Sequence, residues 1–264
     1  MSKKHRHYHR PAGWNPVAAW YDSWMGEDGG EYHREIAIPA VLELADIQPG
    51  ERILDVGAGQ GVLTPAVARA GGVYTGVDVS ERLLGLARKR HGHLGRFLLG
   101  DARKLPALPG LHAGEFDKVI FLLSIQDMHP LQPVLRSVAW ALKAGGRVVL
   151  LMTHPCFRIP RQSGWNWDDE RKLRYRRIDR YLTPLSVPMK EYPGQPRGVT
   201  TSFHRPLEQY VNGLAASGLL VDSMLEIPTH KIHENGAQAK ADNRANQEIP
   251  LFLALRARKL ARSD

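Results

Sequence analysis

The chain has 264 residues and a formal net charge of +9, the excess of 36 lysines and arginines over 27 aspartates and glutamates. Its length can bury a full hydrophobic core, and 43% hydrophobic with 24% charged residues is typical of a globular protein. No apolar run approaches the roughly 20 residues of a membrane-spanning helix. The basic, His-rich N-terminus lacks the apolar stretch of a secretory signal, and the single cysteine, Cys156, excludes an intramolecular disulfide. These features favour a cytoplasmic protein that does not associate with membranes.

Positive charge gathers in two short stretches. Lys3 to His7 forms a basic tail, and residues Arg171 to Arg180 carry six basic side chains against one acidic one. The second stretch is either a solvated face, partly neutralised by the acidic residues 168–170, or a docking surface for an acidic substrate or a nucleic acid. The sequence leaves both readings open.

The N-terminal region contains few regular patterns. Residues 1–16 are expected to be disordered or loosely packed. Residues 17–34 mix aromatic side chains with glycines, which predicts a helix that frays into a loop. Ile36 to Ala45 carries apolar residues on one side, as a helix does.

The most informative stretch follows. The apolar run Arg52 to Val56 predicts a buried strand, glycines occupy alternate positions 57, 59 and 61, and Leu63 to Ala70 is amphipathic. A strand that turns through glycines into a helix lets backbone N–H groups approach a ligand closely. The next apolar run, Val73 to Val77, ends in Asp78, whose carboxylate is well placed to accept hydrogen bonds from a ribose diol. These features predict a nucleoside-binding crevice.

Strands and helices alternate along the rest of the core. Strands are expected at 52–56, 73–77, 96–99, 117–123 and 147–153, with helices at 61–70, 81–90 and 132–142. This alternation predicts an α/β fold with a doubly wound, mostly parallel sheet.

Residues 155–205 break the alternation with prolines, arginines and aromatics, and residues 174–181 alternate as a hairpin strand does. Because this insertion follows the carboxyl end of the fifth strand, where open α/β sheets bind ligands, we expect a substrate lid. Pro206 to Ser217 then predicts a helix, while Leu219 to Ile227 and Ile249 to Ala257 predict two strands. His233 to Gln247 is expected to be a long polar connection between those strands.

The glycine spacing, with Asp55 two residues before Gly57, resembles the first motif of the class I S-adenosylmethionine-dependent methyltransferases. Four further blocks resemble later motifs of the family in the expected order: residues 76–80, 100–106, 116–120 and 142–150. The resemblance implies a seven-stranded Rossmann-like sheet with an antiparallel last strand. It divides the chain into a tail and cofactor flap (1–34), a cofactor-binding core (35–154), the lid (155–205) and the C-terminal part of the core (206–264).

S-adenosylmethionine is the cofactor that the resemblance implies, with Asp78 on the ribose, Val79 on the adenine face and Asp101 at the adenine edge. The implied cofactor-binding residues are Tyr21, His33, Arg34, Asp55, Gly57, Ala58, Gly59, Asp78, Val79, Asp101, Ala102, Phe121 and Leu122. Tyr21, His33 and Arg34 resemble N-terminal elements that fold over the cofactor in many small-molecule methyltransferases.

A general base is harder to assign. His129, His154 and His204 each follow or precede an expected element near the crevice, and histidine titrates near neutral pH. These three are the candidate catalytic residues. No metal is predicted, because the sequence lacks a ligand-spacing signature.

Methyl transfer to an oxygen or nitrogen of a small-molecule acceptor, planar or anionic, is the preferred function. The alternatives are an RNA- or protein-directed methyltransferase that docks through Arg171 to Arg180, and a non-catalytic adenosylmethionine-binding protein. The N/D-P-P-Y/F motif of many nucleic-acid base methyltransferases is absent from Leu122 to Pro130, which weakens the first alternative. A nicotinamide oxidoreductase is disfavoured by the glycine spacing. The acceptor and the oligomeric state are left open.

Overall fold

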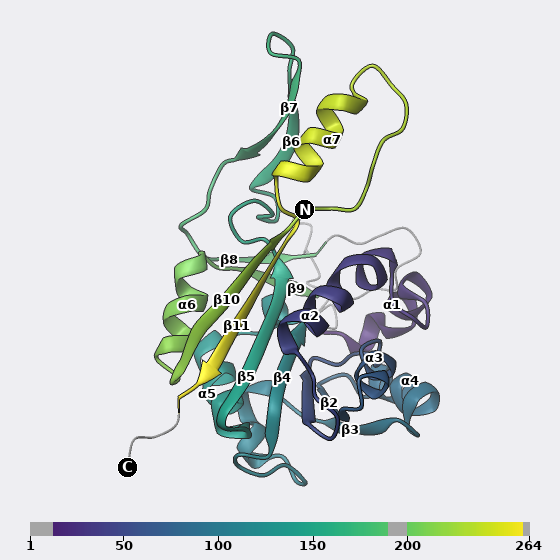
Figure 1. Ribbon diagram of the computed structural model, residues 1–264, viewed down its shortest axis with the longest axis vertical. Helices are drawn as coiled ribbons and strands as arrows, with labels where there is room; N and C mark the ends of the chain where they lie inside the picture. Colours follow the sequence, from purple (N-terminus) through teal and green to yellow (C-terminus); the bar gives the residue numbers. More distant parts are fainter. Residues whose placement is uncertain (1–12, 190–199, 261–264) are drawn as a thin grey trace, which may run out of the picture.

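A seven-stranded sheet forms the centre of the computed structural model, which describes residues 13–189 and 200–260 (Figure 1). The strand order is β10-β11-β5-β4-β1-β2-β3. The strands are β1 (Arg52–Val56), β2 (Val73–Asp78), β3 (Gly95–Leu99), β4 (Phe116–Leu122), β5 (Leu142–Thr153), β10 (Leu219–Ile227) and β11 (Phe252–Lys259). Only β11 runs antiparallel to its neighbours β5 and β10. The predicted doubly wound sheet with an antiparallel last strand is therefore confirmed.

Helices cover both faces of the sheet, as Figure 1 shows. One core packs the sheet against α5 (Leu131–Ala141), α6 (Leu207–Ala215) and the 3₁₀ segment η3 (Ala102–Ala107). The other packs it against α2 (Ile38–Ala45), α3 (Thr64–Arg69) and α4 (Glu81–His91). β4 serves both cores, because Val119 and Phe121 face the first and Ile120 and Leu122 face the second. Burial on both faces explains why the sequence of β4 is continuously apolar from Val119 onward.

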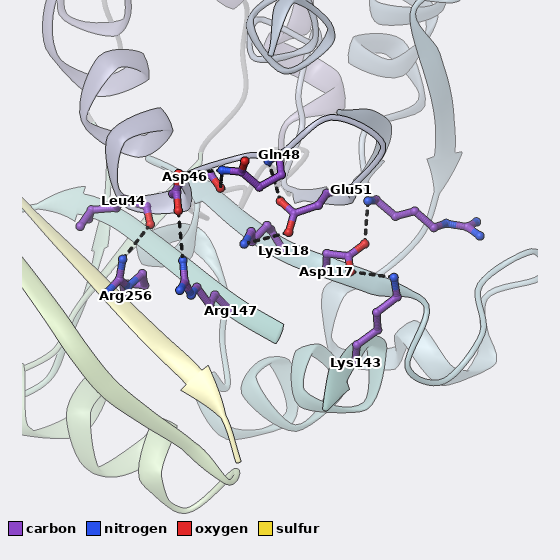
Figure 2. Close-up of polar contacts among 10 residues, drawn as sticks. Leu44, Asp46, Gln48, Glu51, Asp117, Lys118, Lys143, Arg147 and Arg256 are labelled. Atoms are coloured by element: carbon purple, nitrogen blue, oxygen red, sulfur yellow. Dashed lines mark hydrogen bonds and ion pairs between the residues drawn. The ribbon is translucent and has the colours of Figure 1, made fainter. Parts of the chain in front are cut away.

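Ion pairs tie together the amino ends of the parallel strands (Figure 2). Lys118 of β4 pairs with Glu51 at 3.1 Å, and Lys143 pairs with Asp117 at 2.7 Å. Asp117 also accepts the backbone N–H of Arg52 at 2.9 Å, which joins β1 to β4. These contacts lie at the edge opposite the carboxyl ends of the strands, where open α/β sheets bind ligands.

The N-terminal region is more ordered than its sequence predicts. Residues 1–12 lie outside the described residues, but the expectation for 1–16 is wrong at its end, because Asn15–Val17 forms the 3₁₀ segment η1. α1 (Ala18–Met25) follows, and the π-helical segment η2 (His33–Ala37) leads directly into α2. Asn15 is held by the hydroxyl of Ser80, which donates to its side-chain oxygen at 2.7 Å. This contact joins the N-terminus to the start of α4.

Residues after β5 form two small antiparallel pairs. The first is the hairpin β6 (Ser163–Asp168) with β7 (Leu173–Ile178), and the second pairs β8 (Leu185–Pro188) with β9 (Thr201–His204). The strand predicted over 174–181 is confirmed as far as Ile178, and residues 179–181 lie beyond its end. Residues 190–199 lie outside the described residues. Figure 1 shows the β6–β7 hairpin standing beyond the carboxyl edge of the sheet beside α7 (Ala239–Glu248).

The structure corrects the expectation for His233 to Gln247, because most of this polar connection forms the helix α7. Asp242 on α7 pairs with Arg174 of β7 at 3.2 Å, and Asn246 donates to the carbonyl of Lys231 at 3.2 Å. Polar contacts, rather than an apolar stripe, therefore hold this helix. Among the described residues, no helix combines the length and the apolar character needed to cross a bilayer.

Candidate active site

A cavity of about 310 Å³ opens at the carboxyl ends of β1, β2 and β4. Its floor is the turn after β1 and its sides come from the residues after β2, β3 and β4. It is lined by Trp14, Tyr21, Gly57, Gly59, Val77, Asp78, Val79, Leu83, Gly100, Asp101, Ala102, Arg103, Leu122, Leu123, Ser124, Asp127, Met128, His129 and Phe203. The predicted crevice is thus present at the predicted edge of the sheet.

The glycine turn brings the backbone close to neighbouring side chains and to the cavity. Gly57 has φ +78°, and a Cβ built there would lie 2.6 Å from the Cβ of Ser124. The Ser124 hydroxyl donates to the carbonyl of Val56 at 2.6 Å, so it fixes the end of β1 beside β4. Gly59 has φ +55° and faces open space. Glycine is required at both positions because L side chains rarely adopt such angles.

Asp78 lies at the tip of β2 and is 8% exposed. One of its oxygens accepts the backbone N–H of Gly59 at 2.8 Å, and the other accepts that of Ser80 at 2.7 Å. Burial raises the pKa of Asp78, and hydrogen bonds from Ser80, Gly59 and Val79 oppose that rise. The carboxylate therefore holds the glycine turn against β2, and its remaining lone pairs are available to a diol in the cavity.

The residues predicted to contact the adenine lie together in the cavity wall. Val79 is 56% exposed and lines the cavity, so it offers an apolar surface to a flat base. Asp101 pairs with Arg103 at 2.6 Å, and this hydrogen-bonded partner lowers the pKa of Asp101. Ala102 and Leu122 line the cavity beside them.

Three of the expected cofactor residues lie just behind the cavity wall. Asp55 is buried and accepts the hydroxyl of Tyr74 at 2.7 Å, and burial raises its pKa to about 7. Phe121 is fully buried in the core, and Ala58 donates its N–H to the carbonyl of Val77 at 3.1 Å. None of the three residues lines the cavity.

The N-terminal flap contributes aromatic rings to the cavity. Tyr21 of α1 and Trp14 both line it, with their ring centroids 5.1 Å apart in an edge-on arrangement. Burial raises the pKa of Tyr21. Asp22 accepts Arg90 of α4 at 2.5 Å, which anchors α1 over the cavity.

His33 and Arg34 do not line the cavity. Burial lowers the pKa of His33 to about 4, so its ring is neutral, and Arg34 donates to the carbonyl of Gly29. Their predicted contact with the cofactor therefore has no counterpart in the cavity lining.

Of the three candidate histidines, only His129 lines the cavity, with its ring stacked on Phe203 at 4.8 Å. His204 contacts the carbonyl of Tyr181 at 2.6 Å, and His154 contacts Glu226 at 3.0 Å. Burial lowers the pKa of both. Each is thus engaged by a neighbour outside the cavity lining.

Sequence patterns missed several residues that line the cavity, above all Asp127 and Phe203. Asp127 ends the 3₁₀ segment η4 (Ile125–Asp127), directly after β4. Burial raises its pKa to about 8, and the positive charge of Arg205 opposes that rise. A carboxylate soon after the carboxyl end of a parallel strand was the available signal. Phe203 lies on β9, far along the chain, and no local pattern marks it.

The arrangement suits a nucleoside with a charged extension. A buried acid at the ribose position, an apolar surface beside it and a glycine turn open to the cavity are the features that adenosine binding needs. S-adenosylmethionine fits this donor set, and Asp78, Val79, Gly59 and Ala102 are the residues that would hold its nucleoside.

Comparisons with known proteins agree with this geometry. A family model described as "Methyltransferase domain" matches residues 54–150. A solved S-adenosylmethionine-dependent methyltransferase from Mesorhizobium loti has 27% sequence identity and a TM-score of 0.65, covering 83% of this chain and 96% of that one. Residues 54–150 are therefore a methyltransferase domain on the class I S-adenosylmethionine-dependent fold. The predictions of that class and of its cofactor are confirmed.

Two curated relatives extend the comparison. Demethylmenaquinone methyltransferase of Tropheryma whipplei is 35% identical over 121 residues, which is 44% of this chain and 48% of the relative. A ubiquinone biosynthesis O-methyltransferase of Aromatoleum aromaticum is 32% identical over 99 residues, 38% of this chain and 42% of the relative. The matches thus span less than half the length of these relatives.

Proposed function

We propose that the protein transfers the methyl group of S-adenosylmethionine to an oxygen or nitrogen of a small, planar acceptor. The observation that carries the proposal is the cavity itself, in which Asp78 faces the predicted ribose position beside the glycine turn. The bound cofactor supplies an activated methyl group, so the protein has to align the reactants and exclude water.

The far end of the cavity supports a planar acceptor. Phe203 and His129 present stacked rings there, and Met128 lies beside them. Flat rings bind by stacking on aromatic side chains. The names of the two relatives, which refer to demethylmenaquinone and to ubiquinone biosynthesis, agree with an acceptor of this shape. The carboxylate of Asp78 in the wall disfavours an anionic group beside it.

The insertion contributes to the acceptor end through β9, which carries Phe203. We therefore assign the lid function within residues 155–205 to the β8–β9 part. The β6–β7 hairpin supplies no residue of the cavity lining in the described part of the chain, so its role is to hold α7 and the loops beneath it.

An RNA- or protein-directed enzyme is less well supported. Several arginines of the stretch 171–180 already have partners: Arg174 pairs with Asp242, Arg177 with Asp179 at 2.8 Å, and Arg176 donates to Ser163 and to the carbonyl of Phe157. The two ion pairs reduce the charge that a docking surface could offer, and the contacts of Arg176 fix its side chain against the protein.

Replacing Asp78 by alanine tests the proposed function. We expect Asp78→Ala to weaken S-adenosylmethionine binding by about 1–3 kcal/mol, because a buried acceptor of hydrogen bonds from the ribose is lost. Calorimetric titration measures this directly. Asp222→Ala is the matched control, since Asp222 pairs with Arg256 at the β10 edge of the sheet and should leave affinity unchanged. Equal affinities of Asp78→Ala and the wild type would contradict the assignment.

A further inference from the structure

Asp127 is an acid in the cavity wall without a hydrogen-bond donor. Its backbone N–H donates to the carbonyl of Ser124 at 3.0 Å, but no described residue donates to its carboxylate. The side chain lines the cavity directly after β4, on the same wall as Leu122, Ser124 and Met128. Asp127 is only partly exposed, and a carboxyl group that is largely removed from water and has no donors is costly when ionised and stable when protonated.

The charged and titratable groups around Asp127 come from four other elements. Arg205, after β9, is 4% exposed and contributes the nearest positive charge, while Asp78 at the tip of β2 contributes negative charge. The hydroxyl groups of Tyr21 on α1 and Tyr210 on α6 also lie within its electrostatic reach. Farther along the wall, Arg103 is paired with Asp101, and His129 is stacked on Phe203.

The guanidinium of Arg205 does not neutralise Asp127 through a hydrogen bond. It donates instead to the carbonyl of Met128 and to the hydroxyl of Tyr210 at 3.5 Å. The effect of burial therefore outweighs that of the Arg205 charge, and the pKa of Asp127 is about 8. At neutral pH the side chain is mostly a neutral acid in the free protein.

A positively charged ligand favours the ionised form of Asp127 instead. An opposite charge within about 4–6 Å lowers the pKa of a carboxyl group by roughly 1–3 units. S-adenosylmethionine carries a positive sulfur, and S-adenosylhomocysteine, which remains after transfer, carries a neutral one. With its sulfur against this wall of the cavity, the ligand would expose Asp127 to a different field before and after the methyl group has moved.

We propose that Asp127 is the proton acceptor of the reaction: it ionises when the positively charged methyl donor binds and then takes the proton that the methyl acceptor loses. This inference rests on the proposed function. A lone pair of the acceptor's oxygen or nitrogen forms the new bond to the methyl carbon, and the electron pair of the broken carbon–sulfur bond stays on sulfur. When the acceptor's O–H or N–H bond breaks, its electron pair stays on the acceptor and the proton goes to Asp127. Because the sulfur is now neutral, Asp127 keeps that proton until the products leave.

Proton release on ligand binding tests the inference without any acceptor. The full chain is titrated at pH 7 with S-adenosylmethionine and with S-adenosylhomocysteine, each in two buffers of different ionisation enthalpy. We expect the methylated ligand to release on the order of one proton more than the demethylated one. Asp127→Asn removes the contribution of Asp127 and should lower this difference, whereas the control Asp222→Asn should not. Asp127→Glu keeps a carboxyl group and should restore the difference.

The outcomes separate the inference from the proposed function. Failure of the wild type to bind either ligand overturns both. Binding of both ligands with the same proton difference in the wild type and in Asp127→Asn overturns the inference alone. If Asp127→Asn does not fold, affinities of the wild type measured over a pH series test the inference instead. The ratio of its affinities for the methylated and demethylated ligands should rise by up to about tenfold per pH unit between pH 6 and 8. A constant ratio over that range overturns the inference.

Discussion

Gly57 and Gly59 both have positive φ angles, but a side chain would meet different surroundings at each. A Cβ at Gly57 would overlap Ser124, and one at Gly59 would enter the open cavity. We expect Gly57→Ala to lower the free energy of unfolding by about 2–5 kcal/mol, from backbone strain and overpacking together. Gly59→Ala should cost about 1–2 kcal/mol, from strain alone, while weakening cofactor binding.

Denaturant unfolding and calorimetry of both variants separate these effects. Gly110→Ala is the control, because Gly110 has φ +85° with no atom near its Cβ position and does not line the cavity. Equal destabilisation by Gly57→Ala and Gly110→Ala would show that the Ser124 contact is unimportant.

Single residues were predictable where one short motif fixes them. Asp78, Gly57 and Gly59 lie where their spacing after a strand predicts, since strand ends and glycine turns are local features. The raised pKa of Asp127 was not predictable, because it arises from burial and from the negative charge of Asp78, against the positive charge of Arg205, and these groups meet only in the folded chain. The same limit applies to His154 and His204, whose neighbours direct them away from the cavity.

At the scale of elements, we expect the β6–β7 hairpin to contribute to the stability of the protein and not to cofactor binding. The centroid of the Trp165 ring lies 5.1, 4.6 and 5.3 Å from the guanidinium carbons of Arg158, Arg174 and Arg176, so the ring attracts three positive charges. Burial, together with the positive charges of Arg176 and Arg174, lowers the pKa of Arg158 to about 10.

Removal of the hairpin tests this expectation. Gln162 and Asp179 are joined by a backbone hydrogen bond of 2.8 Å, so residues 163–178 can be replaced by two glycines. We expect a lower melting temperature, because α7 loses its ion pair with Arg174, and an affinity for S-adenosylhomocysteine that stays within about twofold of the wild type, well under the tenfold that 1.4 kcal/mol represents. A tenfold loss of affinity in calorimetry would place the hairpin in the cofactor site.

The regular elements were largely predictable, and the irregular ones were not. The central strands are buried on both faces, so each is a largely apolar run in the sequence. Their positions can therefore be predicted to within a few residues. α7 was missed because its stability comes from polar contacts with the hairpin and the loop at Lys231. Helix periodicity reports an apolar face, and this helix has little of one.

At the scale of the whole molecule, the two edges of the parallel sheet have different roles. The amino edge is closed by ion pairs such as Lys118–Glu51 and Lys143–Asp117 (Figure 2). The carboxyl edge carries the cavity, with α1 above it and β9 at its far end. Segments from the N-terminus, the core and the insertion therefore complete one site, which explains why the core motifs alone predicted only part of it.

A crystal structure of the protein soaked with S-adenosylhomocysteine tests the central claim most directly. The account predicts the ribose hydroxyls within hydrogen-bond distance of the Asp78 carboxylate, the adenine against Val79, and the sulfur facing the wall that carries Asp127. A ligand bound away from β1 and β2, or a cavity that stays empty at saturating concentration, would contradict it.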